Sequence, residues 1–178
     1  MRVGGIVLCG GQSQRMRRPK AWLPFGNELM LPRIVRLLRQ VAEPVVVVAA
    51  AAQEVPPLPG EVLLVRDDEG GRGPLQGLAA GLTALTGKVD AAYATSCDVP
   101  FLQPAFVQRL IDLLGDKAIC VPEVAEYRHP LAAVYRLSVL RTITRLLAAN
   151  RLRPTFLFDE IPSTLAVVIK DKITLTFL

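Results

Sequence analysis

The strongest constraint on the fold is a regular alternation of two kinds of segment along the chain. Short apolar runs, rich in valine and alanine, cover residues 4–9, 44–50, 61–65, 90–96 and 117–121. Between them, apolar residues recur at helical spacing over residues 31–41, 74–85 and 103–114. Buried strands that alternate with helices predict a parallel sheet covered on both faces. We therefore expect an α/β fold with a doubly wound, mostly parallel sheet in three αβα layers, within one domain of residues 1–178.

Size and composition restrict the class of protein further. The chain has 178 residues, of which 51% are hydrophobic, so it can bury a core without disulfide or metal support. Its apolar runs are far shorter than the roughly 20 residues that span a bilayer, and its first residues lack the pattern of a signal peptide. We expect a cytoplasmic protein without membrane contact. Cys9, Cys97 and Cys120 form no C-x-x-C motif and are predicted to be buried, reduced thiols.

The charge balance allows an anionic ligand without identifying it. Lys plus Arg number 21 against 16 Asp plus Glu, a formal net charge of +5, which ordinary protein surfaces also show. The cations are not interleaved with aromatic residues, as a platform for single-stranded nucleic acid requires. The composition therefore favours a compact phosphate ligand over nucleic acid.

Chemically active groups follow three of the predicted strands. Gly10 and Gly11 follow the first strand, Asp67 and Asp68 follow the third, and Asp98 follows the fourth. Ligands of open α/β sheets bind outside the carboxyl ends of the strands. A glycine turn opposite carboxylates that can hold a divalent cation predicts nucleotide chemistry there. Turn capping is the alternative role for Asp98, and a solvated turn is an equal alternative for the two other aspartates.

The first glycine turn continues into a basic segment. Ser13, Arg15 and Lys20 all lie within ten residues of Gly10, a pattern that favours phosphate binding over a solvated basic face. The spacing matches neither a Walker A loop nor G-x-G-x-x-G. The sequence therefore predicts a phosphate-binding turn of another type.

These residues carry a family resemblance. The segment "LCGGQSQRMRRPKAWLPF" resembles the L-A-G-G-x-S-x-R-M-G-x-x-K-x-L-L-P-F signature of the sugar-nucleotidyltransferase-like superfamily, in particular of the molybdenum cofactor guanylyltransferase family. Four further blocks follow in that family's order, namely "RDD", "GPLQGLAAGL", "TSCDVPFL" and "RHPLAAVYR". Together they span roughly the first three quarters of the chain. The resemblance implies a Rossmann-like nucleotidyltransferase fold and Mg²⁺-dependent transfer of GMP from GTP to molybdopterin, with release of pyrophosphate.

The resemblance also assigns roles to individual residues. It places Arg15, Lys20 and Asp98 in the transfer itself, with Asp98 as the metal ligand. The residues expected around the nucleotide, including Gly11 and Ser13 of the predicted phosphate turn, are Leu8, Cys9, Gly10, Gly11, Ser13, Arg15, Lys20, Asp67 and Asp98. The implied partners are GTP and molybdopterin. A transient molybdoenzyme or chaperone that receives the product is a further partner that the resemblance allows.

The sequence departs from the family pattern in three places. Arg17 stands where the family usually has glycine, and residues 45–52 offer no side-chain hydrogen bond where the family can offer an asparagine. The chain ends without the family's N-x-N-T-P-E segment. Two alternatives therefore stay open: a cytidylyl or sugar-1-phosphate nucleotidyltransferase, and a nucleotide-binding protein with impaired catalysis.

Overall fold

The computed structural model of the protein describes residues 1–10, 19–67, 71–125, 127–161 and 165–168. The strands in chain order are β1 (Val3–Leu8), β2 (Pro24–Phe25), β3 (Glu28–Leu29), β4 (Val45–Ala50), β5 (Leu63–Asp67), β6 (Ala91–Ser96), β7 (Ile119–Val124), β8 (Tyr127–Arg128), β9 (Ala132–Arg136) and β10 (Leu165–Val168). The α-helices are α1 (Met30–Leu38), α2 (Pro74–Ala84), α3 (Pro104–Leu114), α4 (Leu140–Ala148) and α5 (Leu157–Glu160). Short 3₁₀ turns cover η1 (Lys20–Trp22), η2 (Leu137–Val139) and η3 (Pro154–Phe156). Each predicted strand and helix is confirmed, with ends that shift by a few residues.

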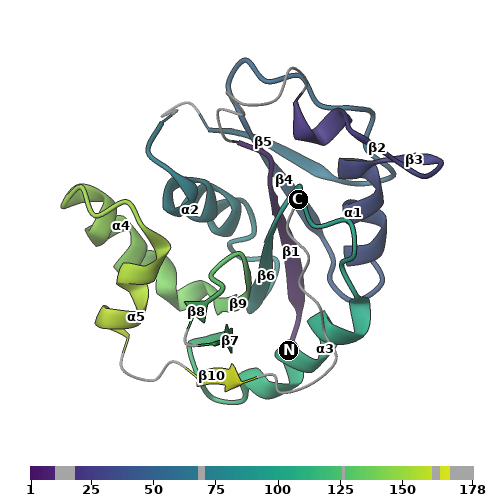
Figure 1. Cartoon of the computed structure of the whole chain (residues 1–178). Coiled ribbons are helices and arrows are strands. Elements are labelled where there is room, and N and C mark those ends of the chain that lie inside the picture. Colours follow the sequence, from purple (N-terminus) through teal and green to yellow (C-terminus); the bar gives the residue numbers. More distant parts are fainter. Residues whose placement is uncertain (11–18, 68–70, 126, 162–164, 169–178) are drawn as a thin grey trace.

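One large sheet forms the middle layer of the molecule (Figure 1). Its strand order is β10-β7-β9-β6-β1-β4-β5, and β8 pairs with β7. The pairs β6-β1, β1-β4 and β4-β5 are parallel, whereas β9 runs antiparallel to both of its neighbours. The mostly parallel, doubly wound sheet is therefore as predicted. A separate two-stranded ribbon joins β2 and β3.

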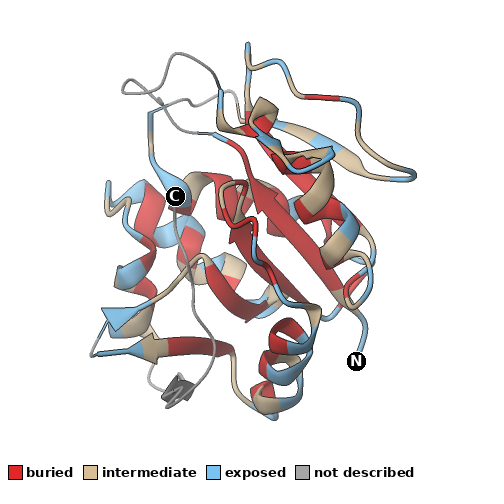
Figure 2. Cartoon of the chain, turned by 45° about the vertical axis from the view of Figure 1, so that its right-hand side comes forward, coloured by how far each residue is buried: buried red, intermediate tan, exposed pale blue. Residues whose placement is uncertain are grey.

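Helices cover both faces of this sheet, α1 and α3 on one face and α2 and α4 on the other (Figure 1). The strand residues alternate between the two faces: Val7 and Val47 pack in the cluster under α1 and α3, and Ile6 and Val46 in the cluster under α2 and α4. Figure 2 shows the resulting buried centre with exposed residues at the periphery. The predicted three-layer architecture is confirmed.

Local sequence explains the helices that cover the two faces. In α1 the buried residues are Met30, Leu31, Ile34, Val35 and Leu38, which recur at helical spacing and form one apolar stripe. Proline occupies the first turn of α2 and α3, where its missing N–H costs no intrahelical hydrogen bond. Sequence analysis did not predict α4, although its buried Ile143, Leu146 and Leu147 follow the same periodicity.

The carboxyl ends of β1, β4, β5 and β6 lie along one edge of the sheet, uppermost in Figure 1 and called the rim below. Because β9 is antiparallel to β6 and Ala132 pairs with Thr95, the residues just before β9 reach the rim too. His129 is one of them; its backbone N–H donates to the carbonyl of Pro122 (3.0 Å). The rim thus gathers segments that lie more than 100 residues apart in the sequence, from the end of β1 to the residues before β9.

Candidate active site

An ion pair between Lys20 and Asp98 lies at the β6 end of the rim. Lys20 Nζ stands 2.6 Å from Asp98 Oδ2, although 78 positions separate the two residues in the sequence. Lys20 begins η1, and the next residue, Ala21, is fully buried in the core that also contains Met30 of α1. Asp98 follows the end of β6. Two groups predicted separately to bind phosphate and metal are therefore in direct contact.

The Asp98 carboxylate is held from both sides. Ser96 Oγ donates a hydrogen bond to Asp98 Oδ1, while Lys20 holds Oδ2. The Asp98 side chain is 18% exposed and that of Lys20 33% exposed. Burial would raise the pKa of Asp98, but the hydrogen bonds from Lys20 and Ser96 outweigh burial and lower this pKa below its usual value. The carboxylate is therefore charged at neutral pH and has its oxygens aimed at the rim.

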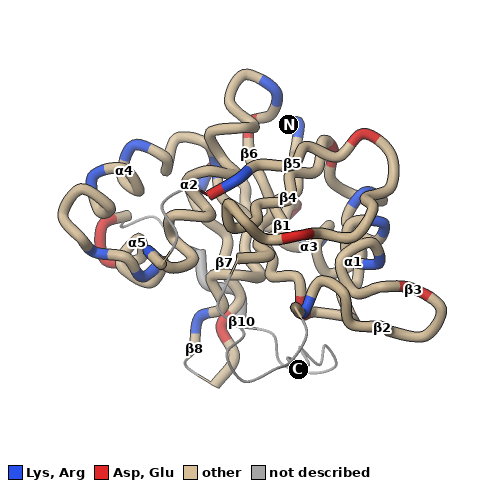
Figure 3. The backbone as a smooth tube through the Cα atoms, turned by 90° about the horizontal axis from the view of Figure 1, so that it is seen from above, with Lys and Arg blue, Asp and Glu red and all other residues tan. Residues whose placement is uncertain are grey.

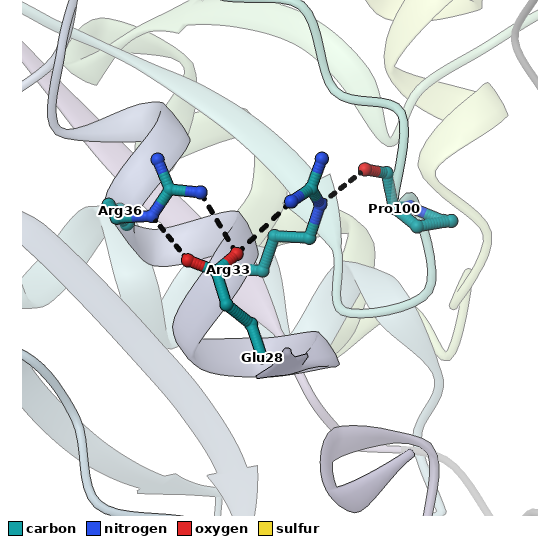
Figure 4. A network of polar contacts seen from close by, with 4 residues as sticks. All are labelled: Glu28, Arg33, Arg36 and Pro100. Atoms are coloured by element: carbon teal, nitrogen blue, oxygen red, sulfur yellow. Dashed lines mark hydrogen bonds and ion pairs between the residues drawn. The ribbon is translucent and has the colours of Figure 1, made fainter. Parts of the chain in front are cut away.

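A second network braces the loop that follows Asp98 (Figure 4). Arg33 of α1 donates from Nε to the carbonyl of Pro100 (3.0 Å) and from Nη1 to Glu28 Oε2 (3.1 Å). Arg36 also donates to Glu28, at 2.7 and 2.9 Å. The Arg33 guanidinium lies over the Phe25 ring, 4.9 Å from its centroid. Through these contacts α1 and the β2-β3 ribbon fix the backbone two residues beyond Asp98.

The end of β1 is tied to strands on both sides. Cys9 N–H donates to the carbonyl of Val48 in β4 (2.8 Å), and Cys97 N–H donates to the carbonyl of Leu8 (3.0 Å). Gly10 is exposed immediately beyond this point, and the nearest atom to a Cβ placed on it would be the Ala50 nitrogen at 3.9 Å. Leu8, Cys9 and Gly10, predicted to line the nucleotide, thus end at the rim beside Asp98. Among the described residues, no side chain comes within 4 Å of a Cβ placed on Gly10.

The cysteines are buried and free of disulfides, as predicted. Cys9 and Cys97, however, extend the β1-β6 register in which Leu8 pairs with Ser96, and their thiol groups are hydrogen-bonded to each other. The contact with Cys97, together with burial, raises the pKa of Cys9 above its usual value. Cys9 is therefore a neutral thiol that packs beneath the rim. It does not act as a nucleophile.

Asp67 lies apart from Asp98. It ends β5, the edge strand, and pairs with Ala50 of β4. Because β1 and β4 intervene between β5 and β6 and strands lie about 4.8 Å apart, the two strand ends are separated by about 14 Å. One metal ion cannot bind both carboxylates. Their separation fits a ligand that spans the rim, with Asp67 and Asp98 at different parts of it.

Several predicted residues lie outside the described part of the chain. These are Gly11, Ser13, Arg15, Arg17 and Asp68, together with the terminal residues 169–178. Their predicted roles stay predictions.

Gln53 was not among the residues predicted from the sequence. It lies in the turn after β4, at the rim. Its Nε2 donates to the Cys9 carbonyl (3.0 Å), and its Oε1 accepts the Ala50 N–H (3.4 Å). The run 45–52 was predicted to offer no side-chain hydrogen bond at this strand end. A carboxamide nevertheless lies there, three residues beyond β4. The available signal was that Gln53 is the first polar side chain after the strand.

The donor groups fit a metal that is shared with a ligand. Among the described residues, no group of three or more His, Cys, Asp or Glu side chains gathers to hold an ion. Magnesium commonly binds one or two carboxylates and completes its shell with water and substrate phosphates. Asp98 can supply such a carboxylate, and the adjacent Lys20 can contact the substrate phosphates.

Two other surface features lie away from this site. A hollow of about 280 Å³ is lined by Arg36, Arg39, Gln40, Glu43 and Pro59, beside the C-terminal half of α1. Figure 3, seen from above, shows Lys and Arg on α1 and α4, at opposite sides of the molecule.

In the part of the chain that the structure describes, no helix has the length and apolar character needed to cross a membrane.

A three-layer α/β fold with a lysine–carboxylate pair and an exposed glycine, Gly10, at the carboxyl ends of its parallel strands is typical of proteins that bind nucleotides. The chain belongs to the family of MobA-like NTP transferase domains, whose family model matches residues 5–161. The family predicted from the sequence motifs is thereby confirmed, and the chain is a nucleotidyltransferase by family.

A curated relative supports the same assignment. The chain is 36% identical over 155 residues to a protein of Mycobacterium avium (strain 104) named "Probable molybdenum cofactor guanylyltransferase". This match covers 84% of the present chain and 77% of the relative.

Solved structures share the fold at lower identity. Molybdopterin-guanine dinucleotide biosynthesis protein A from Archaeoglobus fulgidus superposes with a TM-score of 0.72 at 17% identity, covering 94% of this chain and 83% of that one. A Thermus thermophilus cytidylyltransferase for 2-C-methyl-D-erythritol 4-phosphate gives 0.74 at 17% identity, covering 100% and 93%. The manganese complex of Rv0371C from Mycobacterium tuberculosis gives 0.69 at 19% identity, covering 95% and 89%. At these identities the likeness concerns the fold alone, and it includes proteins that use different bases.

Proposed function

We propose that this protein transfers GMP from GTP to the terminal phosphate of molybdopterin, with Mg²⁺ as the cofactor. The observation that carries the proposal is the contact between Lys20 Nζ and Asp98 Oδ2 at the rim, which joins a phosphate-binding cation to a metal-binding carboxylate. The family match and the name of the 36% identical relative support guanylyl transfer in particular.

The transfer needs positioning and charge neutralisation more than covalent help from the protein. An oxygen of the molybdopterin phosphate forms a bond to the α-phosphorus of GTP, the bond from that phosphorus to the β-phosphate bridging oxygen breaks, and pyrophosphate leaves. Lys20 moves from Asp98 to the phosphates and offsets their negative charge. A divalent metal on Asp98, when bound, supplies Lewis-acid stabilisation to the same phosphates.

The other residues of the rim hold the reacting groups in place. Ser96 keeps one Asp98 oxygen oriented, and Arg33 keeps the following loop fixed through the Pro100 carbonyl. Gly10, exposed at the end of β1, has no side chain to narrow the proposed nucleotide site. Arg15, predicted from the family pattern, adds a second cation on the phosphates.

The test measures pyrophosphate release from the purified protein with Mg²⁺, molybdopterin and each of GTP, ATP, CTP and UTP. The proposal expects release with GTP, loss of release on chelation of the metal, and loss of release in Asp98→Asn. Release with CTP alone, or with sugar 1-phosphates as acceptors in place of molybdopterin, would replace the proposal by the corresponding nucleotidyltransferase. GTP binding without pyrophosphate release would instead identify a nucleotide-binding protein.

A further inference from the structure

We propose that Trp22 is a positioning residue for Lys20, a role that rests on the proposed function of the site. Trp22 ends the η1 turn that Lys20 begins, and its indole Nε1 donates to the Glu54 carbonyl in the connection after β4 (3.1 Å). Trp22 stands where the family signature has leucine, a side chain with no N–H to donate. This hydrogen bond therefore lies outside the signature that identifies the family.

The η1 turn has little internal support. It is three residues long, and the Trp22 N–H donates to the Pro19 carbonyl (3.0 Å) and the Leu23 N–H to the Lys20 carbonyl (3.1 Å). Turns of this kind have poorer hydrogen-bond geometry than an α-helix and stay short. Contacts with other elements therefore determine where η1 lies, and they start with the fully buried Ala21.

Two backbone carbonyls link η1 to its neighbours. The Leu23 carbonyl accepts the Met30 N–H of α1 (2.8 Å), and the Glu54 carbonyl accepts the indole N–H of Trp22. The connection that contains Glu54 is itself held against the protein, because Val55 and Leu58 pack against the same core cluster as Trp22. Trp22 thus joins η1 to a second segment that is fixed to the core.

Adjacent residues of this connection hold both ends of the segment that is predicted to bind phosphate, residues 10–20. Before the segment, the Cys9 carbonyl accepts a hydrogen bond from Gln53 Nε2 (3.0 Å). At its other end, Trp22 donates to the carbonyl of Glu54. The turn after β4 therefore sets where the phosphate-binding segment begins and where it ends.

The turn after β4 is a firm support for these two contacts. The Gln53 N–H donates to the Ala50 carbonyl (3.0 Å), and Gln53 Oε1 accepts the Ala50 N–H (3.4 Å). Arg66 of β5 donates from Nη1 to the carbonyls of both Ala50 and Gln53. A group that is tied to this turn is thereby tied to β4 and β5 of the sheet.

The contact between Trp22 and Glu54 gains importance when a nucleotide binds. Without a ligand, Lys20 Nζ is held by Asp98 Oδ2 at 2.6 Å. In the proposed reaction the ammonium leaves Asp98 for the phosphates, and the reach of a flexible four-carbon side chain then depends on its backbone. A misplacement of about 1 Å can lower a rate by about 10²-fold. By holding η1, Trp22 keeps the Lys20 backbone in place once the side chain has left Asp98.

The experiment removes the indole N–H and measures the affinities of GTP and guanosine, by competition against a fluorescent GTP analogue with Mg²⁺ and without acceptor. Trp22→Phe keeps an aromatic ring against the core and loses the donor. Guanosine lacks the phosphates that Lys20 contacts. We expect Trp22→Phe to weaken GTP binding by about 3- to 10-fold, the strength of one neutral hydrogen bond, and to leave guanosine within about twofold of wild type.

A double-mutant cycle with Lys20→Ala separates positioning from a general loss of structure. Lys20→Ala should itself weaken GTP binding. When Trp22→Phe is added to Lys20→Ala, the GTP affinity should not fall further, because no lysine is left to position. Effects that add would mean that Trp22 acts on the fold and not through Lys20, and they would overturn the inference.

Two controls test whether the N–H group is responsible. The chain contains one tryptophan, so expression in a tryptophan auxotroph supplied with benzothienylalanine replaces the N–H of Trp22 alone by sulfur, in a ring of similar size. This protein should match Trp22→Phe, and wild-type GTP affinity in it would overturn the inference. Thr144→Val removes another exposed hydrogen bond from a side chain to a backbone carbonyl, that of Leu140 in α4 (3.0 Å), and should leave both affinities at wild-type values. Thermal unfolding confirms that each variant is folded at the assay temperature.

The inference is also overturned if Trp22→Phe weakens GTP and guanosine alike, if it weakens neither, or if Lys20→Ala binds GTP as tightly as wild type. Because the readout is binding, it is independent of the proposed transfer. A loss of affinity confined to GTP and absent from the Lys20→Ala background would support the inference even if the wild type released no pyrophosphate with molybdopterin, a result that would reject only the proposed function.

Discussion

Replacing Gly81 by alanine should destabilise the protein, because helix α2 lies too close to strand β1 for a methyl group. A Cβ on Gly81 would stand 2.6 Å from Ile6 Cγ2, 3.0 Å from Ile6 Cδ1 and 3.1 Å from Ile6 Cγ1. Carbon atoms pack best at about 3.5–4.0 Å, so one of the two elements must move by about 1 Å. Ile6 is fully buried, β-branched and paired with strands on both sides, so it cannot turn aside.

The size of the effect follows from two opposing terms. Forced overpacking of a core costs about 1–3 kcal/mol, while alanine in a helix interior gains about 1 kcal/mol over glycine. Because a Cβ at 2.6 Å from Ile6 requires a large shift, the overpacking cost lies in the upper part of that range, about 2–3 kcal/mol, and the expected net loss in the free energy of unfolding is about 1–2 kcal/mol. For a chain of this size, that loss lowers the melting temperature by about 2–8 °C.

Gly77, one helical turn earlier in α2, provides the matched control. A Cβ there would meet the Leu8 Cδ2 methyl at 3.2 Å and other Leu8 atoms only at 3.7 Å or more. The end of a leucine side chain can shift by the few tenths of an ångström required. Gly77→Ala should therefore keep wild-type stability or gain up to about 1 kcal/mol from helix propensity.

Urea unfolding followed by circular dichroism measures both variants against the wild type. The reasoning is refuted if Gly81→Ala is as stable as the wild type, or if the two variants lose equal stability. Equal losses would mean that any side chain on this face of α2 is harmful, irrespective of the distance to β1.

Two further predictions concern the ion pair at the rim. Lys20→Ala should lower the rate of pyrophosphate release by about 10²- to 10³-fold, the cost of one lost donor to transition-state charge, and near-normal initial rates would contradict the role of Lys20. The lowered pKa of Asp98 means that its charged form stabilises the fold: this contribution is complete above the unfolded-state pKa of about 3.9 and is lost as pH falls through the lower folded-state pKa. Asp98→Asn should accordingly be less stable than wild type at pH 7, with the gap narrowing at pH 3 in urea titrations; a gap independent of pH would contradict this reasoning.

Much of the fold could be predicted from local pattern. Strand β4, with four consecutive valines, and helix α1, with its apolar stripe, are each specified by neighbours in the sequence. The position of strand β9 in the sheet could not be predicted from local pattern. Its apolar residues indicate a strand, but they carry no information on its insertion, antiparallel, between β6 and β7. Strand order depends on which elements pack together across the whole chain.

The residues of the candidate site also differ in how far local sequence identifies them. Gly10, Lys20 and Asp98 could be identified from the sequence because each stands at a strand end or within a motif of characteristic spacing. Each of these three residues lies in a continuous stretch of the chain, and a family signature is also read from continuous stretches. Gln53 was not identified: its place after β4 is a weak signal, and its contacts are hydrogen bonds to Cys9, 44 positions earlier, and to a backbone group of its own turn.

By itself, therefore, the sequence determined the types of element, the edge of the sheet on which the candidate site is proposed and the family to which the chain belongs. Those properties depend on residue type and short-range spacing. Only the tertiary structure decided that Lys20 meets Asp98 at 2.6 Å, that Asp67 lies three strands away from Asp98, and that a carboxamide faces the end of β1. Such contacts join residues tens of positions apart, and their distances follow from strand order and helix packing, which no local stretch of sequence encodes.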